Sequence, residues 1–111
     1  MKQRTQGHAF AQNLYYDARS KIYAEKPDLE EGERLLRQSV RLDPKEFFAD
    51  IQLGNVCLKR DSRENALRAY SDALQHASND PGLVRSIEKQ IRLVSSEPVA
   101  QVPELRDPFM E

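Results

Sequence analysis

The sequence predicts an all-α protein of about five helices, and two patterns carry that expectation. Helix-breaking pairs such as Asp43-Pro44 and Asp80-Pro81 divide the 111 residues into intervals of helical length. Within each interval, apolar residues recur at three- and four-residue spacing, which is typical of a helix with one buried face. No stretch alternates apolar and polar residues between turn signals, so strands are not expected.

Each interval contains an apolar stripe that defines one helix. The expected helices cover residues 8–25, 29–42, 45–59, 63–77 and 82–95. In chain order, their stripes are Phe10-Leu14-Ala18-Ile22, Leu35-Leu36-Val40-Leu42, Phe47-Ile51-Leu53-Leu58, Ala66-Ala69-Tyr70-Ala73-Leu74 and Leu83-Ile87-Ile91-Val94. The connections are short, as expected between antiparallel neighbours.

Three helix starts carry the spacing of a capping box, in which a short polar side chain is followed three residues later by Glu. These pairs are Asp28 with Glu31, Asp43 with Glu46, and Asp61 with Glu64. Proline at positions 44 and 81 is compatible with a first helical turn, because the missing N–H has no partner there.

Composition and charge exclude several function classes. With 17 Lys and Arg against 18 Asp and Glu, the net charge is −1, which argues against a nucleic-acid binder. No run reaches the roughly 18 apolar residues of a membrane span, so we expect no direct membrane insertion. The single cysteine, Cys57, excludes an intramolecular disulfide and fits a cytoplasmic location.

The chain lacks the local patterns that catalysis or cofactor binding would need. His8 and His76 have no neighbouring nucleophile or metal-ligand partner in the sequence, and Cys57 falls on a core position. There is no glycine-rich phosphate loop. We therefore expect no enzymatic activity, no metal and no cofactor.

The sequence repeats itself at a shift of 34 residues. Small residues then meet small ones, as Ser20 meets Gly54 and Gly32 meets Ala66. Large residues also coincide, as Leu36 does with Tyr70. A period of this length is that of a helix–turn–helix repeat.

These positions resemble the tetratricopeptide repeat (TPR) family. Residues 47–80 carry Leu53-Gly54-x2-Cys57 and then Ala66-x3-Tyr70 and Ala73, while 13–46 carry Tyr16, Ser20, Tyr23, Gly32, Leu36, Ser39 and Pro44. The resemblance implies a right-handed superhelical stack of antiparallel helix pairs, a TPR-like α-solenoid. It assigns 13–46 and 47–80 as repeats and 82–95 as a capping helix, within a domain over 8–95. The polar residues 1–7 are expected to form a flexible N-terminus.

Small residues should allow the helices of each pair to approach closely. We expect Gly54 to face Ala66 and Ser20 to face Gly32, with Tyr23, Leu36 and Tyr70 filling the space beside them. Three positions depart from the family pattern: Arg19 stands in place of a Leu, Ser78 in place of a Pro, and Asp50 in place of an aromatic residue whose space Phe47 or Phe48 would have to fill.

The resemblance also implies a concave groove, lined by the first helix of each repeat, that takes a peptide. Carried over by position, the groove residues are Leu14, Asp17, Lys21, Phe48, Ile51, Gln52, Asn55 and Lys59. Asp17 stands where carboxylate-clamping members of the family have Lys, which disfavours a C-terminal carboxylate as ligand. Asn55 would bond a peptide backbone and Lys59 would meet an acid. The expected function is a non-catalytic adaptor or scaffold for an unidentified protein or peptide.

Residues 96–111 form a proline-containing extended tail. Prolines 98, 103 and 108 exclude a stable helix. Val99, Val102 and Leu105 recur every three residues and would share one face of a polyproline II strand. The tail either docks, on its own helices or on a neighbour's groove, or is a disordered terminus. The alternative function is a structural or oligomerisation domain of a larger protein, for example an envelope-associated one, with the tail docked on the helices. A second copy of the chain, in a homo-oligomer, is then the candidate partner.

Overall fold

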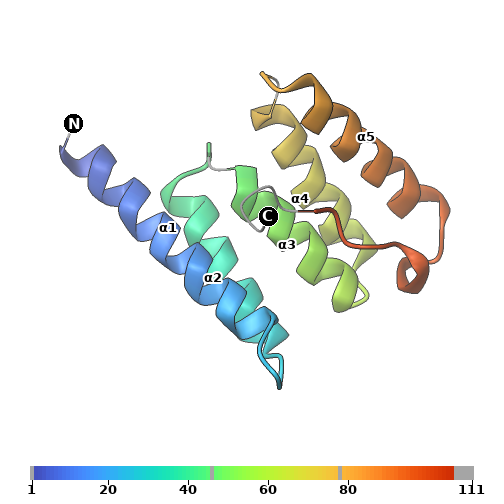
Figure 1. The fold of residues 1–111 in the computed structure, drawn as a ribbon, viewed down its shortest axis with the longest axis horizontal. Coiled ribbons are helices and arrows are strands. Elements are labelled where there is room, and N and C mark those ends of the chain that lie inside the picture. The colour runs from blue at the N-terminus through green and yellow to red at the C-terminus, as the bar shows by residue number, and fades with distance from the viewer. Residues whose placement is uncertain (1, 46, 78, 107–111) are drawn as a thin grey trace.

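The computed structural model describes residues 2–45, 47–77 and 79–106, with side chains from residue 7 onward. This part of the chain is all-α, as expected, and its five α-helices pack in chain order, with the closest packing between α1 and α2 and between α3 and α4 (Figure 1). Their bounds are α1 Lys2–Ile22, α2 Leu29–Leu42, α3 Phe47–Lys59, α4 Arg63–His76 and α5 Pro81–Ser96. A short 3₁₀ helix, η1, follows at Val99–Gln101 and contacts α3.

The polar residues at the helix starts act in three different ways. Asp28 and Asp80 are N-caps, and each accepts a hydrogen bond from the backbone N–H three residues later at 3.1 Å. The expected cap at Asp61 is wrong, because Asp61 has φ 59° in the left-handed region and Ser62 is the N-cap of α4. Asp43 ends α2, and its expected partner Glu46 lies outside the described residues.

Helices α2 and α4 are related by the 34-residue shift in both their bounds and their burial. Both ends of α4 fall 34 residues after those of α2. The buried residues of α2 are Gly32, Leu35, Leu36 and Ser39, and those of α4 are Ala66, Ala69, Tyr70 and Ala73. The two helices therefore present the same positions to the core.

Two glycines allow close contacts, and Tyr70 lies beside Gly54 as expected, whereas Ser20 does not lie beside Gly32. A Cβ at Gly54 would lie 2.4 Å from the Tyr70 ring, and one at Gly32 would lie 2.6 Å from Ile22 Cγ1. Ser20 does not face Gly32, since it is exposed and its hydroxyl donates to the Asp17 carbonyl at 2.7 Å. Large side chains, rather than a second small residue, fill the space above each glycine.

Helix α1 differs from expectation in both length and register. It begins at Lys2 rather than at residue 8, because residues 2–7 include several good helix formers and no proline. Its buried stripe is Ala11, Tyr15, Ala18 and Ile22. Phe10 is 62% exposed and Tyr23 is 41% exposed. Both were expected in the core, and neither lies there.

After α5 the chain turns back over the helices. Figure 1 shows this segment, in red, passing from the end of α5 across the front of α3. Val99, Val102 and Leu105 are half-buried and pack on the hydrophobic core. We call residues 97–106 the tail segment; residues 107–111 of the expected tail lie outside the described residues. No helix in the described ranges has the length and apolar character needed to cross a bilayer.

Candidate functional site

The backbone of Leu105 is held by one side chain, that of Asn55. Asn55 Nδ2 donates to the Leu105 carbonyl at 2.8 Å, and the Leu105 N–H donates to Asn55 Oδ1 at 2.9 Å. Asn55 lies in the middle of α3 and is 1% exposed. A buried amide of this kind requires hydrogen-bond partners, and an extended backbone supplies them here.

Asn55 belongs to a chain of hydrogen bonds that links three helices. The Tyr70 hydroxyl of α4 donates to Asn55 Oδ1 at 2.5 Å. Gln90 of α5 donates to that hydroxyl at 3.3 Å and to the Pro103 carbonyl at 2.7 Å. Burial raises the pKa of Tyr70, so the hydroxyl keeps its proton and remains a donor. The network fixes the orientation of the two amides that bind the tail segment.

The side chain between these two backbone contacts, Glu104, is held by charge. Its Oε1 lies 2.5 Å from Lys59 Nζ, and its Oε2 accepts from the Tyr23 hydroxyl at 3.1 Å. Lys59 Nζ also lies 4.7 Å from the centre of the Tyr23 ring. We call the surface formed by Tyr23, Asn55, Lys59 and Gln90 the tail-binding surface.

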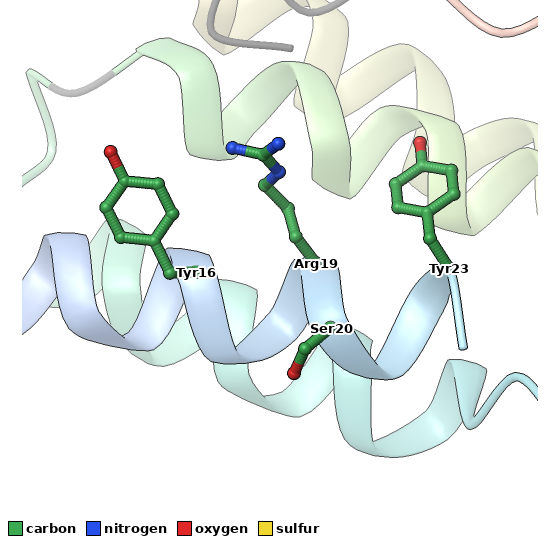
Figure 2. A pocket seen from close by; sticks show the side chains of 4 residues that line it. All are labelled: Tyr16, Arg19, Ser20 and Tyr23. Carbon is green, nitrogen blue, oxygen red and sulfur yellow. The ribbon is translucent and has the colours of Figure 1, made fainter.

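An open pocket of about 360 Å³ adjoins this surface on α1. Tyr16, Arg19, Ser20 and Tyr23 line it. Figure 2 shows Tyr16, Arg19 and Tyr23 pointing from α1 toward α3, while Ser20 points away. The guanidinium carbon of Arg19 lies 5.6 Å from the centre of the Tyr16 ring, so the pocket combines an aromatic wall with a positive charge.

Of the groove residues expected from the sequence, those on α3 and those on α1 fall into separate groups. Asn55 and Lys59 contact the tail segment directly, and Gln52 is buried with its Oε1 3.2 Å from the Tyr23 hydroxyl. Ile51 is fully buried and Phe48 is half-buried, so Ile51 belongs to the core.

The three expected residues on α1 are not brought to this site. Asp17 and Lys21 are exposed, and Leu14 is half-buried against the core. With 3.6 residues per turn, they lie on a different face of α1 from Tyr16, Arg19 and Tyr23.

Sequence reasoning missed Tyr23, Tyr70 and Gln90 as parts of the site. Tyr23 and Tyr70 were assigned to packing, and Gln90 received no role. One signal was available for Gln90, since a Gln on the same face as Ile87 and Val94 is a polar residue in an apolar stripe.

The histidines each lie beside a carboxylate. His8 Nδ1 is 2.5 Å from Asp43 Oδ2, and His76 Nδ1 is 3.9 Å from Asp50 Oδ2. Asp50 is 1% exposed, and burial, followed by the nearby Asp72, raises its pKa to about 7. Within the described ranges, no group of three His, Cys, Asp or Glu side chains is placed to hold a metal ion.

Comparison with known proteins gives no relative. The chain matches no family model, no curated protein and no solved structure.

Proposed function

We propose that this chain is a non-catalytic protein-interaction module, of TPR-like architecture, that binds an extended segment of a partner protein. The observation that carries the proposal is the pair of hydrogen bonds between Asn55 and the backbone of Leu105. A side-chain amide that bonds both backbone groups of one residue recognises an extended chain whatever its side chains are.

The architecture supports the TPR-like part of the proposal. Helices α2 and α4 repeat their bounds and buried positions at a 34-residue shift, which is the TPR period. The groove expected from the resemblance includes both Asn55 and Lys59 of α3. There, Asn55 would bind a peptide backbone and Lys59 would bind an acidic side chain. The proposal also includes a cytoplasmic location and no cofactor.

The test is affinity capture from the source-cell lysate on the full chain, with bound proteins identified by mass spectrometry. The site variant is Asn55→Ala/Lys59→Ala, and the control is Glu88→Ala/Lys89→Ala on exposed positions of α5. We expect a partner that the wild type and the control retain and the site variant loses. Identical captured proteins on all three baits would contradict the proposed site.

The alternative function, a structural or oligomerisation domain, has one observation in its favour. The chain's own tail segment already occupies the tail-binding surface, which is what a self-contained structural unit requires. Sedimentation over a hundredfold range of concentration distinguishes the two functions. A mass that rises with concentration favours oligomerisation, and a constant monomer mass favours the interaction module.

A further inference from the structure

We propose that the tail-binding surface recognises a short extended peptide in which an acidic residue precedes a large aliphatic one, and that Pro103-Glu104-Leu105 is an internal ligand that such a partner displaces. This inference rests on the proposed function and adds to it the chemistry of the partner and the regulation of the site.

The backbone contacts define an extended ligand in a fixed register. Gln90 binds the carbonyl of Pro103, and Asn55 binds both backbone groups of Leu105, two residues later. Alternate residues therefore face the buried amides, as in the recognition of an added strand. The intervening residue, Glu104, turns its side chain toward Lys59 and Tyr23.

The side-chain contacts define which residues the surface prefers. Both oxygens of the Glu104 carboxylate have a donor, one from α3 and one from the end of α1. A lysine at this position would face the Lys59 ammonium, and a neutral residue would forfeit the ion pair. Leu105 is half-buried and packs on the core, which favours a large aliphatic side chain after the acid.

One of the contacts that hold the tail segment, the ion pair between Lys59 and Glu104, is suited to exchange. The Lys59 and Glu104 side chains are 32% and 37% exposed, and an ion pair so accessible to water contributes little free energy. A partner with the same acid–aliphatic pattern offers the same donors and acceptors. Only the molecules whose tail segment has left the surface can bind the partner. The internal ligand therefore weakens the apparent affinity for the partner in proportion to the fraction of such molecules.

The experiment measures binding of a fluorescent peptide with the sequence of residues 98–106 to the full chain by anisotropy. The variant Glu104→Ser/Leu105→Ser, called the released variant, removes the side-chain contacts of the internal ligand and leaves only its backbone contacts, and Leu105→Ser alone is the milder version should the double variant not fold. We expect the released variant to bind the peptide at least tenfold more tightly than the wild type does. Equal binding by the two chains, or none by either, would overturn the inference.

A charge reversal tests recognition of the acid. In the released variant, Lys59→Glu should lose the peptide and gain binding to the same peptide carrying Glu104→Lys. If Lys59→Glu leaves the preference unchanged, the acid is not read by Lys59. If the wild type dimerises and the released variant does not, the occupant is the tail of a second copy, and displacement by a partner peptide is wrong.

Selection from a random peptide library on the released variant separates this inference from the proposed function. Enrichment of an acid followed by Leu, Ile or Met supports both. Enrichment of a different pattern overturns the inference and leaves a peptide-binding module. No enrichment at all contradicts both.

Discussion

Asn55 binds Leu105 as a neighbouring strand would, although Asn55 lies in a helix. Its side chain donates to the Leu105 carbonyl at 2.8 Å and accepts from the Leu105 N–H at 2.9 Å. Because Asn55 Oδ1 also accepts from the Tyr70 hydroxyl, both lone pairs of that oxygen are used. Asn55 Oδ1 thus links the core to the tail segment, because it accepts one hydrogen bond from Tyr70 and one from Leu105.

Asn55→Ala should loosen the tail segment and lower stability. The change leaves the Tyr70 hydroxyl and the Leu105 backbone without their partner, at a cost of about 1–3 kcal/mol in the free energy of unfolding. Hydrogen exchange at the Leu105 amide should be slow in the wild type and fast in the variant, while exchange in the middle of α2 should be slow in both. If the Leu105 amide exchanges equally slowly in both chains, Asn55 is not what holds the tail segment.

The ion pair between Lys59 and Glu104 should show a small, salt-sensitive coupling. A double-mutant cycle with Lys59→Ala and Glu104→Ala should give a coupling free energy of about 0.2–1 kcal/mol at low salt, since both groups are partly exposed. The coupling should shrink in about 0.5 M salt, because added ions screen the two charges. The Debye length is already only about 10 Å at roughly 0.1 M ionic strength, and it is shorter at the higher concentration. The measurement is urea denaturation of the four chains at each salt concentration.

Gly54→Ala should disturb the core and the site together. The new methyl group would meet the Tyr70 ring at 2.4 Å, and moving the ring also moves the hydroxyl that orients Asn55. We expect a loss of about 1–3 kcal/mol in the free energy of unfolding. The matched control is Gly82→Ala in the exposed first turn of α5, where the nearest atom lies at 3.6 Å and the change should be neutral or stabilising.

Asp50 should make stability fall as pH rises. Its pKa is about 7 in the folded chain against an ordinary 3.8, so the folded state holds the proton more tightly. The resulting stability is complete below about pH 4 and is lost as pH rises through 7, with a slope of at most about 1.4 kcal/mol per pH unit. Asp50→Asn should flatten this dependence and raise the melting temperature at pH 8. Parallel profiles for the two chains would contradict the buried-carboxyl explanation.

Cys57 should react with thiol reagents only when the chain opens. The side chain is fully buried, and burial raises the pKa of its thiol to about 11. The rate of labelling by an aromatic disulfide at pH 8 should therefore follow the unfolding equilibrium as urea is added. Rapid labelling in the absence of urea would show that the third helix is accessible to reagents.

The helices could be predicted from the sequence because their signals are local. The bounds of α2 agree with expectation since Asp28 caps the first turn and the chain breaks at Asp43-Pro44. The start of α4 at residue 63 agrees with expectation, but its cap was misassigned because Asp61 and Ser62 are both good caps by type, and only the left-handed backbone at Asp61 decides between them.

The site could be predicted only in part because its register depends on packing. Asn55 and Lys59 were expected from their positions in α3, a helix whose faces the repeat defines. Helix α1 carries apolar residues on two faces, and composition does not show that Tyr15 is buried while Tyr16 is 48% exposed. That Glu104 and Leu105 meet Lys59 and Asn55 is a contact across some 50 residues, which no local pattern encodes.

The covalent link between α5 and the tail segment sets the conditions under which any partner can compete. Only eight residues lie between Ser96 and Leu105, so the internal ligand is present at an effective concentration on the order of millimolar. A soluble partner at micromolar abundance, with the same intrinsic affinity, would occupy few copies. Partners that display several acid–aliphatic motifs, or that are held beside this chain in an assembly, would gain the avidity needed to open it.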